Sequence, residues 1–280
     1  MQTVQKAKTI IITGANKGVG YGILENLAQK PTPYRFILGV RSIENGKNAL
    51  KQLSKLVPDI EECSIVRELD ISNSDSIKAF TNWLEKEHGP VDALVNNAGM
   101  AFKGDAFDDE VVRITFKTNF YGTIELTEAV LPHINNNGKV VTVGSSAGKF
   151  KILKNEDLKN KLDDPEITKD TLLKVAEEFY NTVKDGTFEK LGYPKQSYAM
   201  SKLLINLYAR VLGKDPEVVK RNIQVYACCP GWVKTDMAGD KAPRTIQEGS
   251  VCPSFLVELP WEIKKDYQGK FFYDCVVTSL

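Results

Sequence analysis

This sequence of 280 residues has few of the side chains on which several classes of protein depend. It contains five cysteines and two histidines. So sparse and odd a cysteine count argues against a disulfide framework and favours a reducing compartment, so we expect a cytoplasmic protein. The cysteine spacing is not that of a zinc site, and we expect no metal. The cysteines are Cys63, Cys228, Cys229, Cys252 and Cys275.

An excess of charge and a long apolar run are also missing. The 37 basic and 36 acidic residues leave a net charge of +1. This balance gives no electrostatic reason to expect a nucleic acid or an anionic membrane as partner. No apolar run approaches the roughly 20 residues that a membrane helix needs. The first residues form a short polar tail that leads into a strand, without the apolar stretch or cleavage site of a signal peptide.

Short β-branched runs alternate with amphipathic stretches along most of the chain. Runs of this kind, without polar alternation, are typical of parallel strands buried on both faces. Right-handed crossovers then give an α/β fold with a doubly wound parallel sheet of the Rossmann type. The predicted strands are Thr9–Thr13, Arg35–Val40, Cys63–Leu69, Ala93–Asn96, Lys139–Gly144, Ile223–Ala227 and Lys270–Tyr273. The predicted helices are Gly18–Gln29, Ile43–Leu56, Ser74–His88, Val111–Leu131, Ser197–Leu212 and Thr245–Leu259.

One polar segment, about residues 149–195, interrupts this alternation. Long loops without structure are rare in compact domains, so we expect helix within it. Apolar residues fall at helical spacing from Leu172 to Val183, Thr168 can cap the start, and Gly186 lies just beyond the end. No linker or repeat marks a second domain. We therefore predict a single domain over residues 1–280, with a helical insertion before the helix that begins at Ser197.

A glycine-rich loop follows the first predicted strand and leads into the first helix. Gly14, Gly18 and Gly20 suit a tight turn, a close approach of backbone to a pyrophosphate, and tight packing of helix on strand. The helix start supplies free N–H groups. A glycine-rich turn without a ligand is the alternative, but the position in the alternating pattern favours a dinucleotide site. The remaining loop residues expected to bind the cofactor are Asn16, Lys17 and Val19.

Charge near this loop decides which nucleotide is expected. An acidic residue at the end of the second strand would bind an adenosine ribose and repel a 2′-phosphate. This strand ends instead in Arg41, and Lys17 lies inside the glycine loop. Two cations favour the 2′-phosphate, which Arg41 can grip with two hydrogen bonds. We predict NADPH rather than NADH, the alternative being that Arg41 is a solvated loop residue.

Two further segments end neighbouring strands. Asp70 follows the third strand, where it could bind the adenine amino group or cap a helix. The segment Asn96–Gly99 closes the fourth strand. Its small residues and amide side chains would let the loop lie flat against a cofactor.

Tyr198 and Lys202 begin a predicted helix and are four residues apart, so their side chains share a face. A free tyrosine, with a pKa of about 10, is a poor proton donor at neutral pH. Lowering that pKa by two or three units needs about 3–4 kcal/mol, which one cation at about 4 Å can supply. The spacing alone is also common in surface pairs.

The order of motifs resembles the short-chain dehydrogenase/reductase family over nearly the whole chain. The resemblance implies that Tyr198 protonates a carbonyl oxygen as hydride arrives, while Lys202 lowers the tyrosine pKa and holds the nicotinamide ribose. It also implies a serine at the substrate oxygen and a water anchored by Asn119. The motifs are the glycine loop, Asn96–Gly99, Asn119, the serine pair Ser145 and Ser146, Tyr198 with Lys202, and Pro230-Gly231. The implied cofactor contacts further along are Asn97, Pro230, Gly231, Val233 and Thr235.

The position of a glycine indicates which of the two serines is the catalytic one. Relatives usually show two serines with a glycine three residues after the second, which is the catalytic one. Here Gly148 lies three residues after Ser145, so Ser145 is predicted and Gly144 replaces the usual first serine. Ser146 is the alternative.

Within the family the chain looks most like the monomeric carbonyl reductases. The Asn-Lys of the glycine loop and the long segment between Ser145 and Tyr198 carry this likeness, and the extra helix implies a monomer. Cys229 and Lys103 resemble positions that engage glutathione-type ligands, although Cys229 could simply be a buried small residue. The expected apolar substrate contacts are Phe102, Trp232 and Met237.

We therefore expect an NADPH-dependent reductase of aldehydes, ketones and quinones. The alternative is a nucleotide-binding or sensor protein that has kept the fold but not the chemistry. A third reading, that Gly144–Gly148 is a hydrolase nucleophile elbow, needs a histidine after the serine, and the last histidine is His133.

Overall fold

Eight strands form one sheet in the order β3-β2-β1-β4-β5-β6-β7-β8, in a computed structural model that describes residues 7–260 and 265–280. Parallel pairing joins the strands from β3 to β7, and β8 turns back antiparallel on β7. The predicted doubly wound α/β sheet is confirmed. The strands are β1 (Lys8–Thr13), β2 (Tyr34–Val40), β3 (Ser64–Glu68), β4 (Val91–Asn96), β5 (Ile134–Val143), β6 (Gln224–Cys229), β7 (Phe271–Tyr273) and β8 (Val276–Val277).

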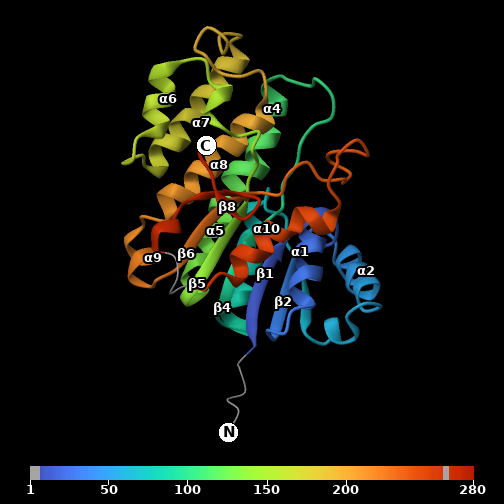
Figure 1. The fold of residues 1–280 in the computed structure, drawn as a ribbon. Helices are drawn as coiled ribbons and strands as arrows, with labels where there is room; N and C mark the ends of the chain where they lie inside the picture. The colour runs from blue at the N-terminus through green and yellow to red at the C-terminus, as the bar shows by residue number, and fades with distance from the viewer. Residues whose placement is uncertain (1–6, 261–264) are drawn as a thin grey trace.

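Helices cover both faces of this sheet (Figure 1). One layer contains α1 (Gly18–Ala28), α2 (Ile43–Leu53) and α10 (Ile246–Glu258). The opposite layer contains α3 (Ser74–Trp83), α4 (Asp109–Phe116), α5 (Thr123–Val130), α7 (Lys169–Lys184) and α8 (Ser197–Leu212). Two shorter helices are α6 (Glu156–Asp163) and α9 (Pro216–Lys220).

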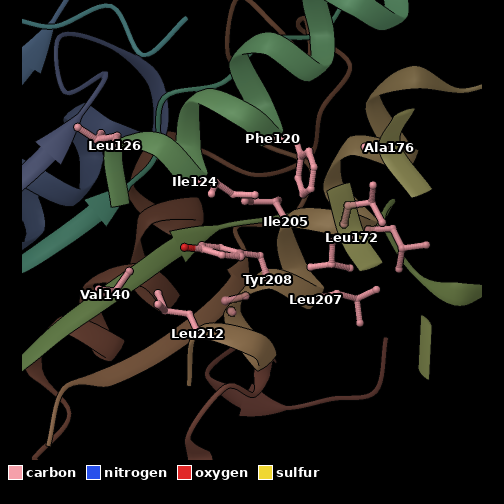
Figure 2. Close-up of a cluster of buried hydrophobic side chains, with 14 of the residues drawn as sticks. Phe120, Ile124, Leu126, Val140, Leu172, Ala176, Ile205, Leu207, Tyr208 and Leu212 are labelled. Carbon is pink, nitrogen blue, oxygen red and sulfur yellow. The ribbon is translucent and has the colours of Figure 1, made fainter. Parts of the chain in front are cut away.

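Successive strand residues point into the two different layers, which explains why the strands lack polar alternation. In β1, Ile11 packs against the layer of α5 and α8, whereas Ile10 and Ile12 pack against that of α1 and α10. All three side chains are at most 1% exposed. Figure 2 shows part of the core between the sheet and the layer of α5 and α8. Ile205 of α8, Leu172 of α7 and Val140 of β5 are among its labelled side chains.

The first and last long helices, α1 and α10, lie side by side. A β-carbon on Gly22 would lie 2.7 Å from side-chain atoms of both Ile246 and Ser250, so the two backbones approach closely. Asn26 Nδ2 also donates to Ser250 Oγ at 2.8 Å. The nucleotide half of the sheet is thus closed by residues from the far end of the chain.

The segment before α8 forms the predicted helical insertion. Thr168 caps α7 by accepting a hydrogen bond from Thr171 N, and Gly186 beyond its end has φ +70°. Phe179 of α7 packs on Phe116 of α4 with ring centroids 5.6 Å apart. The insertion is therefore part of the main core rather than a separate unit.

The long helix predicted over Val111–Leu131 is interrupted, which corrects that expectation. A π-helical turn, Lys117–Gly122, separates α4 from α5. A β-carbon on Gly122 would lie 1.8 Å from the Ile71 carbonyl oxygen, so this turn is seated directly against the loop after β3. Such π turns are frequent at functional sites. The chain also turns π-helical over Leu84–His88, where α3 was predicted to continue.

Within the described ranges, no helix is long and apolar enough to cross a bilayer.

Candidate active site

The glycine loop opens at the carboxyl end of β1 with the geometry that a phosphate cradle needs. Gly14 and Gly18 have φ values of +66° and +57°, which favour glycine. A β-carbon on Gly20 would lie 2.5 Å from the Gly14 carbonyl oxygen. Lys17, the N-cap of α1, makes no side-chain capping bond. The N–H groups of the first turn therefore have no cap, and they suit a diphosphate.

Asn97 ties the end of β4 to this loop. Its side-chain Nδ2 donates to the Thr13 carbonyl at 2.8 Å, and its backbone N donates to Thr13 Oγ1 at 2.9 Å. The predicted contact of Asn97 with the cofactor stays a prediction. What the structure adds is that the Asn97 amide positions the glycine loop.

The residues expected at the adenosine end follow three different strands or loops. Arg41, directly after β2, is exposed. Lys17 forms an ion pair with Asp236 at 2.6 Å, and both side chains are largely exposed, so this pair is weak and salt-sensitive. Asp70 accepts bonds from the backbone N and the hydroxyl of Ser72, whereas Asn73 caps α3. The helix-capping alternative for Asp70 is thus wrong.

Tyr198 and Ser145 meet at the carboxyl edge of the sheet. Tyr198 lies in the first turn of α8, and Ser145 follows the end of β5. Their hydroxyl groups are hydrogen-bonded to each other. Ser146 instead accepts a hydrogen bond from the Cys229 thiol at 3.4 Å. The structure therefore brings Ser145 to the tyrosine and Ser146 to Cys229.

Lys202 and Asn119 converge on Gly99. A β-carbon there would lie 3.2 Å from Asn119 Oδ1 and 3.6 Å from Lys202 Nζ, which explains the glycine. Lys202 Nζ donates to the Val143 carbonyl at 2.8 Å. The Asn119 amide accepts from Met100 N and donates to Met100 O, each at 2.8 Å. Asn119, in the π-helical turn, thus fixes the loop after β4.

Burial controls the ionisation of the two reacting groups. It raises the pKa of Tyr198 to about 12, although the hydrogen bond from Ser145 acts in the opposite direction. It also lowers the pKa of Lys202 to about 8. The expectation that the Lys202 charge lowers the tyrosine pKa stays a prediction. The amine is 5.8 Å from the ring centroid of Tyr198 and loses its proton before the phenol does.

Asn206, which the sequence analysis missed, continues the face of α8 that carries Tyr198 and Lys202. Its Nδ2 donates to the carbonyls of Ser145 and Gly148, each at 3.0 Å. A β-carbon on Gly144 would lie 1.8 Å from Asn206 Oδ1. This crowding explains why glycine replaces the usual first serine. The i, i+4, i+8 spacing was the signal that could have identified Asn206.

Arg244 and Asp274, also missed, support the loop after β6. Arg244 makes two hydrogen bonds to the Asp274 carboxylate, at 2.6 and 2.9 Å, and a longer one of 3.4 Å to the Pro230 carbonyl. The Arg244 side chain also fills the space beside Gly231, where a β-carbon would lie 2.6 Å from it. Arg244 therefore contacts both of the predicted residues Pro230 and Gly231. It belongs to no short sequence motif, so the sequence did not reveal it.

The expected apolar substrate contacts lie exposed on two loops. Phe102 is 39% exposed, Trp232 56% and Met237 43%. The pKa of the Asp236 carboxyl is lowered mainly by Lys17 and, to a smaller extent, by the Lys103 ammonium. Cys229 is 2% exposed.

The Cys229 sulfur is engaged within its own loop. It accepts a bond from Gly231 N at 3.3 Å and donates one to Ser146. This environment fits a buried small residue better than a ligand-binding thiol.

Thr235 brings the loop after β6 to the glycine loop. A β-carbon on Gly18 would lie 3.3 Å from Thr235 Cγ2, so Thr235 faces the phosphate cradle. Val233 is 3% exposed and pairs with Arg244 in an isolated bridge. The cradle, Thr235 and the exposed cation Arg41 together fit a phosphorylated dinucleotide.

Comparisons with known proteins agree with this geometry. Residues 8–155 match the model of a family described as short chain dehydrogenase. The chain is 36% identical to carbonyl reductase (NADPH) 3 of Rattus norvegicus, with 98% of both chains covered. It is 35% identical to carbonyl reductase (NADPH) 1 of Homo sapiens, over 89% of this chain and 90% of that one. The solved structure of salutaridine reductase from Papaver somniferum has a TM-score of 0.82 at 26% identity, over 96% of this chain and 100% of that one.

Proposed function

This chain belongs to the short chain dehydrogenase family, and from that premise we infer that it is an NADPH-dependent oxidoreductase that reduces the carbonyl group of small molecules. The observation that carries the inference is the hydrogen-bonded pair of Tyr198 and Ser145, at the edge of the sheet where the glycine loop opens. A proton donor and a second hydroxyl at one point are what a carbonyl oxygen needs as it becomes an alcohol.

The residues that would hold the dinucleotide are those of the glycine loop, with Thr235 across from it and Arg41 and Lys17 at its 2′-phosphate. NADPH, when bound, supplies the hydride for the reaction. Pro230, Gly231 and Val233 belong to the loop that would meet its nicotinamide end.

Tyr198 would donate its proton to the carbonyl oxygen, and the Ser145 hydroxyl would hold that oxygen. With a pKa of about 12, the phenol keeps its proton at neutral pH until the substrate oxygen becomes basic. The Lys202 amine, with a pKa of about 8, is protonated at neutral pH, and its charge would stabilise the phenolate that proton donation leaves. Asn119 would keep the loop after β4 in place through its two bonds to Met100.

A substrate screen tests this function. Oxidation of NADPH, with NADH in parallel, is followed at 340 nm over aldehydes, quinones, dicarbonyls and ketosteroids. We expect turnover with NADPH, a preference over NADH, and a loss of at least about 100-fold in kcat for Tyr198→Phe, because the general acid is removed. The matched control is Tyr180→Phe, on the insertion helix α7, which should leave the rate unchanged.

Two results would contradict the inference. Full activity in Tyr198→Phe would remove the proposed acid. Tight NADPH binding without turnover of any carbonyl would favour a sensor protein.

Finer properties belong to the same proposal. We propose that the protein is a cytoplasmic monomer, supported by free thiols throughout its described chain and by the insertion helix packed on α4. Carbonyl-bearing glutathione conjugates are proposed as further substrates, with Lys103 as the exposed cation for their carboxylates. One such conjugate belongs in the substrate screen.

A further inference from the structure

Three cysteine thiols meet on the side of the sheet away from the catalytic tyrosine. The sulfur of Cys252 is hydrogen-bonded by the thiols of Cys228 and Cys275 and by the backbone N–H of Cys275. Cys228 and Cys252 belong to the core formed with α1 and α10, and Cys275 packs against that core. None of the three takes part in the reaction described above.

The fold explains why residues from three elements meet there. Cys228 lies in β6, directly beside Phe272 of β7. Cys275 occupies the two-residue turn that joins β7 to β8, and both turn residues have positive φ, +49° at Asp274 and +63° at Cys275. Cys252 lies on α10, which packs over β6. The pairing of β6 with β7 and the packing of α10 on β6 thus bring the three cysteines together.

The three thiols differ in their exposure to solvent. Cys228 is fully buried and Cys252 is 5% exposed, whereas Cys275 is half-buried in a surface turn. A dissolved oxidant therefore reaches Cys275 first, and Cys252 is the thiol that touches it.

We propose that Cys252 and Cys275 form a reversible disulfide when the protein meets a hydroperoxide, which makes the β7–β8 turn a redox modification site. The Cys275 sulfur attacks the hydroperoxide, the O–O bond breaks, and an alcohol, or water in the case of hydrogen peroxide, leaves. The Cys252 sulfur then attacks the sulfenic acid at Cys275. An S–S bond forms, and the hydroxyl leaves with the Cys252 proton as water.

Burial, and next the neighbouring Cys252, raise the pKa of Cys275 to about 11, which makes its attack on the hydroperoxide the slow step. The environment of Cys252 favours the second step. The hydrogen bonds from Cys228 and Cys275 lower its pKa, which increases the fraction of attacking thiolate. Cys275 shares a turn with Asp274, the partner of Arg244. The modified turn is therefore continuous with the support of the Pro230 loop.

Thiol counting and peptide mapping test the proposal. The folded protein is treated with hydrogen peroxide, quenched, denatured and titrated for free thiols. We expect the five thiols of the chain to fall by two and to return with dithiothreitol. A tryptic digest without reductant should show residues 245–264 linked to residues 271–280. Other links, or an unchanged thiol count, would overturn the proposal.

Two variants make the result specific. Cys275→Ser should lose no thiol pair under the same treatment, and Cys63→Ser, remote in sequence from the cluster, should still lose two. A vicinal link within residues 222–234, which hold Cys228 and Cys229, or a link from this peptide to Cys252, would count against the proposal. Because the peptide map is made on the unmutated protein, the test stands even if a variant does not fold.

Discussion

At the scale of single residues, burial sets the protonation of the two reacting groups in opposite directions. Burial raises the pKa of the Tyr198 phenol to about 12 and lowers the pKa of the Lys202 ammonium to about 8. Both shifts have one cause, the cost of a charge in a desolvated site. The proposed catalyst therefore needs the lysine charge when the phenol gives up its proton.

The pH dependence of reduction follows from Lys202. Below about pH 8 its amine is charged, and above this value the charge is lost, so kcat/KM should fall as the pH rises through about 8, by up to tenfold per unit. The measurement is NADPH oxidation from pH 6 to 10. Lys202→Arg keeps its charge over this range, so a slower but flat profile is expected of it. A flat profile in the parent protein would contradict the assignment.

Gly144 is a second residue with a measurable consequence. A serine there would bring its β-carbon to 1.8 Å from Asn206 Oδ1, so Gly144→Ser should lower the free energy of unfolding by about 1–3 kcal/mol. In an Asn206→Ala background the same substitution should cost less, because the blocking oxygen is gone. Urea unfolding of the four proteins measures this coupling, and an equal cost in both backgrounds would rule out the clash.

The sequence could predict only those site residues that belong to a recurring motif. Tyr198, Lys202, Ser145 and Asn119 were predicted from the family resemblance that their order in the chain carries, and the structure brings them together. Arg244 belongs to no motif, and its partner Asp274 is close to it only because β7 lies beside β6. A contact made by sheet pairing has no local signal in the chain.

At the scale of elements, the link between the β7–β8 turn and the loop after β6 supports one end of the site. Arg244→Gln should weaken the hydrogen bond to the Pro230 carbonyl and raise the KM for NADPH several-fold. The Tm should change little, because the ion pair between Arg244 and Asp274 is partly exposed. Steady-state kinetics with a thermal melt measures both quantities. Arg113→Gln, which breaks the surface pair with Glu110, is the matched control. An unchanged KM for NADPH would exclude this supporting role.

Elements with a strong local pattern were predicted closely, and those set by tertiary contact were not. The helix predicted over Ser197–Leu212 is α8 without change. The π-helical turn at Lys117–Gly122 was missed because its cause is the Ile71 carbonyl, far away in sequence. The two-residue strand β8 exists only as a partner of β7 and is too short for a pattern.

At the scale of the whole molecule, the insertion should determine the oligomeric state. In α7, Phe179 packs on Phe116 of α4, and Ala176, Glu177 and Tyr180 line a pocket together with Tyr121 of the adjoining π-helical turn. With that side of α4 covered, we expect a monomer of 31.2 kDa by size-exclusion chromatography with light scattering. A stable dimer or tetramer at micromolar concentration would contradict this expectation.

The doubly wound sheet could be predicted because each parallel strand and each crossover helix has its own periodic pattern. The crossover rule fixes the handedness of each connection, whereas the order of the strands came only from the structure. The packing of α1 against α10 could not be predicted, because the sequence of neither helix indicates which other helix it contacts.

That last pairing has a consequence for synthesis on the ribosome. Gly22 and Asn26 of α1 are translated more than 200 residues before the Ser250 that they contact. The side of α1 that carries Gly22 and Asn26 therefore lacks its α10 partner until nearly the entire polypeptide has been synthesised. Nascent chains stalled before α10 should be far more sensitive to protease in their first fifty residues than the finished protein.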